Sequence, residues 1–405
     1  MIFPDRVRGG VEQAIVRKDS RVGAGAGKQP GWRGAATRGR GARAGKGGDA
    51  PAPRALGRER PLVDVDPWGA LLEALLGPSE SEVGGEHRPG GLADTTPEPS
   101  TVDPDALGRA RGALLGLAVG DAVGTTVEFM PKGGFPPITD MVGGGPFGLE
   151  AGRWTDDTSM ALCLAESLLA DSGLSARDLT DRFDRWEAEG HNSSTGRCFD
   201  IGHTTLAAIE RYRRTGDPLA GDPSPRAAGN GSVMRLAPVA IRWWRDPDTA
   251  EAVAREQSLT THAAPEAVDA CALLARMLAG AIGGGGREAV LAPRVDPGWR
   301  PSIRAIAAEG WRGKAEAEVR STGYVVHTLE AAVWAFAGAT CFEEAVLRAV
   351  NLGDDADTVG AVAGQIAGAV YGLGGIPERW TNRLYRKQDI LDLGARLFAS
   401  GLPGA

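Results

Sequence analysis

The segment Asn351–Gly372 reads NLGDDADTVGAVAGQIAGAVYG, a run of carboxylates followed directly by small and apolar residues. The part from Ala361 to Tyr371 carries no charge, which predicts a helix that is buried on all sides. Gln365 and several glycines interrupt the longer apolar run Val359–Ile376, so we interpret it as a core helix rather than a membrane span. The acids would then lie at the start of a buried helix.

A second segment has the same order of features. Trp154-Thr-Asp-Asp-Thr158 precedes the apolar stretch SMALCLAESLL, and other stretches between residues 105 and 405 also carry apolar residues at helical spacing. Strand-like alternation is almost absent. The pattern predicts a single compact all-α domain over residues 105–405, with many helices. The helices are expected at Asp105–Val119, Thr158–Ala170, Leu179–Glu189, Ile201–Arg214, Ala250–Leu259, Pro265–Ile282, Val325–Ala337, Phe342–Val350, Ala361–Tyr371 and Asp389–Ala399.

Residues 1–104 differ in composition from the rest of the 405-residue chain. They are rich in Gly, Ala, Arg and Pro without an apolar period, which predicts a disordered extension, with one short amphipathic helix at Pro67–Leu76. Residues 1–60 hold 14 basic and 5 acidic side chains. A basic arm that touches nucleic acid and a tail without function are both compatible with this balance, and we favour the tail.

Composition also excludes several classes of protein. Residues 105–405 are mildly acidic, which gives no reason to expect nucleic-acid binding by the globular domain. The cysteines Cys163, Cys198, Cys271 and Cys341 are far apart, so we expect reduced thiols rather than disulfides or a zinc site. No secretory signal and no membrane span is apparent, which predicts a cytoplasmic protein.

The two acid strings have two alternative explanations. Asp and Thr cap helix N-termini, because their side chains accept hydrogen bonds from free N–H groups. One acid suffices for a cap, however, and adjacent carboxylates before a buried helix repel each other unless a cation neutralises them. The strings offer only carboxylate and hydroxyl oxygens, which suit Mg²⁺, Mn²⁺ or Ca²⁺ and argue against Zn²⁺. If the strings converge, they could hold two ions about 4 Å apart.

Other candidates lie between the strings. Asp121 either ends the first helix or belongs to the site, and Glu128 is a candidate for a desolvated carboxylate. Two glycine-containing segments, 143–148 and 229–235, could present backbone N–H groups to a phosphate. His262 precedes a helix, and a lone histidine is more often structural than catalytic.

Taken together and in this order, six segments make the chain resemble the ADP-ribosylglycohydrolase family, which includes dinitrogenase-reductase-activating glycohydrolases. They cover much of residues 112–372. The matching strings are GALLGLAVGDAVGTTVEF, GGGPFGLEAGRWTDDTSMALCLAESLL, CFDIGHTTLAAI, GNGSVMRLAPVAI, THAAPEAVDACALL and NLGDDADTVGAVAGQIAGAVYG.

The resemblance implies a dinuclear Mg²⁺ or Mn²⁺ centre and a role for each matching residue. Asp354 does not match a ligand and is expected to cap its helix. Asp200 matches an acid near the attacking water, and Glu128 matches an acid near the scissile bond; both are candidate catalytic residues. The implied metal ligands are Thr155, Asp156, Asp157, Asp355, Asp357 and Thr358. The residues implied around ADP-ribose are Gly143, Gly144, Gly145, Asn230, Gly231, Ser232, Met234 and His262.

The chain departs from the family pattern at Thr126, where proline is common, and at His203, where asparagine is usual; the second change could alter acceptor preference. The implied activity is hydrolysis of the bond between ADP-ribose and an acceptor, with ADP-ribosyl-arginine on protein as the expected substrate. Serine-linked, O-acetylated, polymeric or nucleobase-linked ADP-ribose are alternatives. A non-catalytic, crystallin-like ADP-ribose-binding protein and a two-metal phosphoesterase are further alternatives. The expected partner is an ADP-ribosylated protein or small conjugate, and the expected state is a monomer.

Overall fold

Helices account for most of the computed structural model, which describes residues 104–402. The predicted extension and its short helix at 67–76 lie outside the described residues. No strand occurs in the described part, where pairing is limited to isolated bridges such as Gly144 with Leu149, so the all-α prediction is confirmed. The longer helices are α2 (Pro104–Gly124), α3 (Asp156–Ala170), α4 (Ala176–Glu189), α5 (His203–Thr215), α7 (Pro247–Leu259), α8 (Pro265–Gly280), α11 (Val325–Ala337), α12 (Phe342–Val350), α13 (Ala356–Tyr371) and α15 (Lys387–Ser400).

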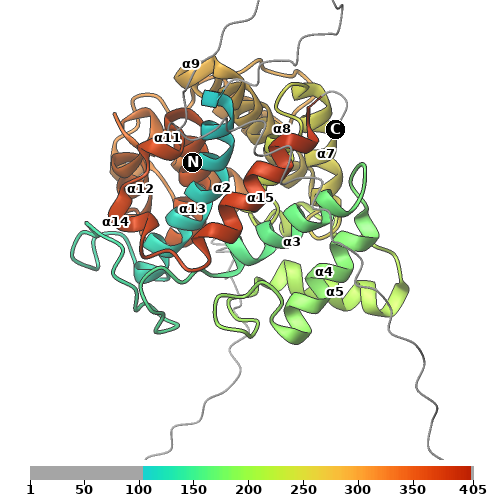
Figure 1. The fold of residues 1–405 in the computed structure, drawn as a ribbon. Helices are drawn as coiled ribbons and strands as arrows, with labels where there is room; N and C mark the ends of the chain where they lie inside the picture. The colour runs from blue at the N-terminus through green and yellow to red at the C-terminus, as the bar shows by residue number, and fades with distance from the viewer. Residues whose placement is uncertain (1–103, 403–405) are drawn as a thin grey trace, which may run out of the picture.

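Helices α2 and α13 lie against each other in the middle of the fold (Figure 1). Glycines recur every four residues on both helices and face one another. A Cβ atom added to Gly120 would lie 2.0 Å from the carbonyl oxygen of Gly360, and one added to Gly364 would lie 2.0 Å from that of Gly116. Backbone therefore meets backbone along this contact, which leaves no room for larger residues.

The remaining helices surround this pair. In Figure 1, α4 and α5 lie together below α3. Helices α7 and α8 lie on one side of the central pair, and α11 and α12 lie on the opposite side. Side chains of α2, α3, α8, α11 and α13 supply most of one continuous apolar core. Large aromatic residues fill its edges, including Trp154, Trp186, Phe336 and Trp380, all at most 1% exposed.

Several short helices were not predicted. They are α6 (Ala237–Arg242), α9 (Gly286–Leu291), α10 (Pro301–Ala307) and α14 (Glu378–Thr381). Each has four to seven residues, which is too short for an apolar period to repeat. The first predicted helix also ended too early, because α2 continues past Val119 to Gly124 and places Asp121 inside it.

One helical segment of the described residues, Pro265–Leu291, is long and apolar enough to cross a membrane by length and composition alone. It is a different segment from the run Val359–Ile376 that seemed nearest to this description in the sequence. Within its most apolar window, 72% is buried inside the protein, as is common for a core helix.

Candidate metal centre

The two acid strings meet at one buried place, although they are about 200 positions apart in the chain. Asp156 and Asp157 begin α3, and Asp357 lies in the first turn of α13. The three residues offer carboxylate oxygens that all lie within 4.8 Å of one another. Because α13 packs against α2, and α2 in turn holds the start of α3, the fold itself brings the strings together.

Asp121 on α2 holds the start of α3 in place. Its Oδ1 atom accepts hydrogen bonds from the backbone N–H and the hydroxyl of Thr155, both 2.9 Å long. Its Oδ2 atom accepts the backbone N–H and the hydroxyl of Thr158 at 3.0 and 2.6 Å. Two backbone N–H groups at the start of α3 are thus satisfied by a side chain of a neighbouring helix. Asp121 does not end its own helix, and Asp156 and Asp157 are not needed as caps.

Threonine hydroxyls connect the two strings. Thr155 Oγ1 lies 3.0 Å from Asp357 Oδ2 and 3.3 Å from Asp157 Oδ2, and Thr358 Oγ1 lies 3.4 Å from Asp157 Oδ2. The Thr155 hydroxyl has a single hydrogen and also lies against Asp121, so it can serve only one of these carboxylates at a time. The carboxylates therefore face each other with fewer donors than they have lone pairs.

Asp355 is held from the other side of the cluster. Asn230 Nδ2 donates to Asp355 Oδ2 at 2.6 Å and also approaches Thr328 Oγ1 at 2.9 Å. The expected cap at Asp354 is wrong. Asp354 is exposed with a left-handed backbone (φ 53°), whereas Asp355 is the N-cap residue of α13 and makes no capping side-chain hydrogen bond. The turn is fixed instead by backbone bonds between Asp354 and residues 129 and 130.

The electrostatics of the cluster fit a bound cation. Burial and neighbouring carboxylates raise the pKa of Asp156 and Asp157 well above the ordinary value. Burial and the charge of Asp357 raise the pKa of Asp355 to about 8. Among the described residues, Asp157 Oδ1 and Asp357 Oδ1 are buried without any hydrogen-bond partner. Unpaired buried oxygens surrounded by like charge, with no His or Cys among them, match the donor set of a hard divalent ion.

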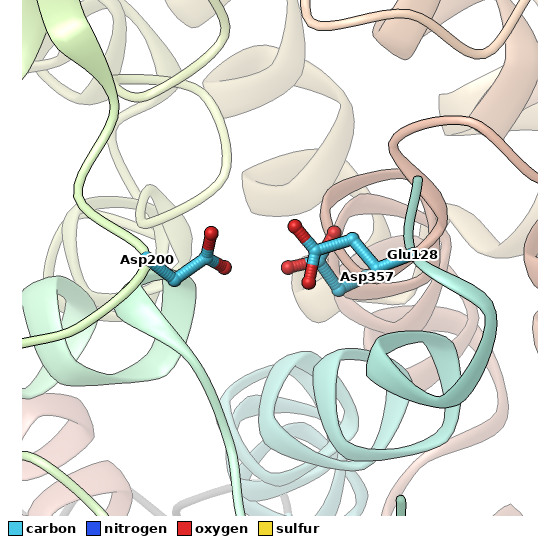
Figure 2. A group of neighbouring side chains, drawn as sticks. All are labelled: Glu128, Asp200 and Asp357. Atoms are coloured by element: carbon cyan, nitrogen blue, oxygen red, sulfur yellow. The ribbon is translucent and has the colours of Figure 1, made fainter. Parts of the chain in front are cut away.

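Two further acids approach the same cluster. Figure 2 shows the carboxylate of Asp200 pointing toward those of Glu128 and Asp357, and oxygens from all three lie within 4.8 Å of one another. Burial first, and then the charges of neighbouring acids, raise the pKa of both Glu128 and Asp200. Glu128 is 3% exposed and its Oε2 atom has no partner among the described residues. Asp200 has a left-handed backbone (φ 57°), a strained conformation that tends to persist where function requires it.

The predicted glycine loop at 143–145 forms a tight turn beside Glu128. Its three glycines all have positive φ, and a bridge between Gly144 and Leu149 closes the turn. A Cβ on Gly145 would lie 2.1 Å from the Thr125 carbonyl oxygen, so only glycine fits there. Thr126 donates to the carbonyl oxygen of Gly143 at 3.1 Å, which fixes the loop from the position where the family commonly has proline.

The residues predicted around 230–234 and His262 lie in two settings. Asn230 reaches the cluster, whereas Ser232 and Met234 are 0% and 2% exposed and lie beneath the loop. The Ser232 hydroxyl accepts a hydrogen bond from the Ser258 hydroxyl, and the Met234 carbonyl accepts one from Gln365. His262 packs under Gly231, where a Cβ would lie 2.6 Å from its Cε1 atom.

The ring of His262 is 2% exposed and its Nδ1 atom lies 2.8 Å from the Thr261 hydroxyl. Burial lowers the pKa of His262 to about 3, so the imidazole is neutral at physiological pH. A neutral, buried ring that supports Gly231 accords with the structural interpretation of a lone histidine.

Comparison with known proteins agrees with this geometry. A family-wide sequence profile described as ADP-ribosylglycohydrolase matches residues 102–404. The chain belongs to the ADP-ribosylglycohydrolase family. Enzymes of this family are therefore its relatives, and the helical fold is theirs as well.

Two relatives are named ADP-ribosylarginine hydrolase Tri1. The one from Serratia proteamaculans is 45% identical over 75% of this chain and 82% of its own length. The one from Pseudomonas putida is 48% identical over 74% and 80%. The ADP-ribosyl-[dinitrogen reductase] glycohydrolase of Rhodospirillum rubrum is 37% identical over 70% and 92%. A solved structure titled ADP-ribosylglycohydrolase-related protein complex aligns with a TM-score of 0.66, at 45% identity over 74% of this chain and 99% of that chain.

Within this glycohydrolase site, sequence reasoning missed the full role of Asp121 and the contribution of Thr328. A usable signal for Asp121 is its position among glycines that recur every four residues, at 116, 120 and 124. A buried helix interior rarely carries an unpaired carboxylate. Thr328 had no signal, since it is a single hydroxyl on the apolar helix α11 whose partner lies 98 positions away.

Proposed function

We propose that this glycohydrolase removes ADP-ribose from modified arginine side chains of proteins, at a centre that holds two Mg²⁺ or Mn²⁺ ions. The observation that carries the proposal is the buried convergence of Asp156, Asp157 and Asp357, with unpartnered oxygens on two of them. The arginine linkage is supported by the names of the relatives that are 45% and 48% identical. We likewise propose a cytoplasmic, monomeric enzyme.

The residues that would hold the ions are Thr155, Asp156, Asp157, Asp355, Asp357 and Thr358. When bound, such ions supply Lewis acidity for the ribose hydroxyls and lower the pKa of a water. Asp121 and Asn230 would orient these ligands through the hydrogen bonds to Thr155, Thr158 and Asp355.

Asp200 and Glu128 are proposed to move protons beside the anomeric carbon. Cleavage passes through an oxocarbenium-like state and needs a base for the attacking water and an acid for the departing guanidine. Burial and like charge raise the pKa of both carboxyls well above the ordinary value, which favours a proton held on one of them while the other accepts one. Which carboxyl plays which part follows from single substitutions to Asn and Gln.

The test is a panel of substrates incubated with the enzyme and Mn²⁺. Arginine-, serine- and acetyl-linked ADP-ribose are supplied separately, and the products are identified by mass. Release of ADP-ribose from the arginine conjugate is expected. Release from the serine or acetyl conjugate alone would reassign the linkage, and release of AMP would identify a phosphoesterase. Binding of ADP-ribose without turnover of any conjugate would indicate a non-catalytic protein.

A further inference from the structure

A polar cavity of about 500 Å³ lies outside the acid cluster, between the loop 147–153, the loop 193–197 and Tyr385. Its volume is typical of a ligand site. None of the proposed metal ligands, and none of the residues predicted to surround ADP-ribose, lines it. Another cavity, of about 540 Å³ beside α11 and α12, is lined by other residues. We refer to the first as the Arg197 cavity.

The Arg197 cavity adjoins the candidate active site through two segments of chain. Arg153 lines the cavity, and the same segment continues through Trp154 into the acid string at Thr155. Arg197 lines the facing wall, three residues before Asp200. Phe147, which lines the cavity, packs edge-on against Phe199, the residue before Asp200, with ring centroids 5.2 Å apart. A group bound in the cavity would therefore lie near the candidate active site, against walls that include none of the clustered acids.

The charge of this cavity differs from that of the cluster. Arg153 is fixed in its wall, because it stacks 3.9 Å over the Tyr385 ring, donates to the Ser194 carbonyl and pairs with the exposed Glu150 at 3.3 Å. Arg197 is exposed, and among residues 104–402 its guanidinium has no hydrogen-bond or ion-pair partner. Two arginines against one glutamate leave the cavity with a positive charge available to a ligand.

We propose that the Arg197 cavity binds an acidic side chain of the acceptor protein, near the ADP-ribosylated residue. The inference rests on the proposed function, because it assigns the protein side of the same substrate. A guanidinium binds a carboxylate through two parallel hydrogen bonds. The cavity's aromatic walls, Phe147 and Tyr385, can cover the aliphatic part of such a side chain.

The experiment compares two peptides that carry ADP-ribosyl-arginine, one with glutamates on both sides and one with lysines on both sides. The quantity measured is the ratio of kcat/KM for the glutamate peptide to that for the lysine peptide, in which any general damage to the enzyme cancels. We expect the wild type to favour the glutamate peptide, and Arg197→Glu to lower the ratio roughly tenfold, since the substitution removes an exposed ion pair and adds repulsion between two carboxylates.

The matched control is Arg214→Glu. Arg214 is also exposed and has no hydrogen-bond or ion-pair partner among residues 104–402, but it lies in the last turn of α5, about 16 Å along that helix from its start at His203. The control should keep the wild-type ratio. An unchanged ratio in Arg197→Glu, or an equal fall in Arg214→Glu, would overturn the proposed cavity. Failure of the wild type to cleave free ADP-ribosyl-arginine would instead overturn the proposed function, and the inference with it.

Discussion

The carboxylate of Asp121 accepts two hydrogen bonds from Thr155, one from its backbone N–H and one from its hydroxyl, each 2.9 Å long. This contact joins the central helix α2 to the first acid string. The position of the proposed metal ligands on α3 therefore depends on a residue that is itself 0% exposed and offers both of its oxygens to threonines.

Asp121→Asn replaces one acceptor oxygen by an NH₂ group, which cannot accept the two hydrogen bonds from whichever of Thr155 and Thr158 it faces. We expect the affinity for Mn²⁺ to fall by roughly 10- to 100-fold, as is usual when a residue that orients metal ligands is changed. Isothermal titration of the purified protein with Mn²⁺ measures the effect. The control is Asp178→Asn, which removes a surface pair with Arg182 on α4. Equal affinities in both variants would contradict this role.

Asp156→Ala and Asp357→Ala each remove a carboxylate from the centre of the cluster. We expect kcat to fall by more than about 10³-fold while the far-ultraviolet circular dichroism stays unchanged, because metal ions contribute several kcal/mol of transition-state stabilisation. Asp354→Ala is the control, since that acid is exposed and next in sequence to the second string. Normal turnover in both cluster variants would rule out the two-ion proposal.

Chelation should act in the same direction as these substitutions. EDTA is expected to abolish hydrolysis, and added Mg²⁺ or Mn²⁺ to restore it, because the donor set consists of carboxylate and hydroxyl oxygens. Zn²⁺ should restore activity poorly, since no His or Cys is among the ligands. The measurement is ADP-ribose release before and after dialysis against each ion. Full activity in EDTA would show that the reaction needs no exchangeable ion.

The metal-free protein should lose stability as the pH rises. Burial raises the pKa of Asp355 from 3.8 to about 8 and that of Asp357 to about 6 in the folded state. Between pH 3.8 and about 8, the unfolded chain releases protons that the folded chain retains. The free energy of unfolding therefore falls as the pH rises through this range. Tm in EDTA should therefore be lower at pH 8 than at pH 5.

Asp355→Asn tests the origin of that pH dependence. The variant cannot ionise at this position, so its Tm should fall less between pH 5 and pH 8 than that of the metal-free wild type. Bound Mn²⁺ should also reduce the fall in the wild type, because the ion favours the charged carboxylates. An identical pH dependence in the variant and in the wild type would assign the effect to other groups.

Gly364→Ala places a methyl group 2.0 Å from the carbonyl oxygen of Gly116. We expect the free energy of unfolding to fall by about 1–3 kcal/mol, because α2 and α13 must move apart. The control is Gly108→Ala on helix α2, where an added Cβ has nothing within 4 Å. This variant should instead stabilise the protein by about 0.5–1 kcal/mol. Chemical denaturation of both variants measures the two effects, and equal stabilities would contradict the close contact.

Much of this site could be predicted because its acids are adjacent to one another in sequence. Asp156-Asp157 and Asp355–Asp357 each stand before an apolar helix, so a local pattern reveals them. Their convergence is a property of three-dimensional packing, and the pattern alone left capping as an alternative. The capping hydrogen bonds come from Asp121, 34 positions before Thr155, which no local rule could assign.

The Arg197 cavity is a feature that the sequence alone could not predict. Its walls come from loops around 150 and 195 and from Tyr385, and exposed loop residues carry no periodic signal. The short helices α6, α9, α10 and α14 were missed for a related reason, since four to seven residues are too few for an apolar period to repeat.

The close contact of the α2 and α13 backbones limits which substitutions the protein can tolerate, as well as contributing to its stability. Where side chains separate two helices, pairs of compensating substitutions can change the distance between the helices. Here, a side chain at Gly120 or Gly360 would push the two helices apart, because an added Cβ would lie 2.0 or 2.6 Å from the carbonyl oxygen of the other glycine. We therefore expect changes of acceptor choice to be tolerated more readily in the surrounding loops than along α2 and α13, which carry Asp121 and Asp357.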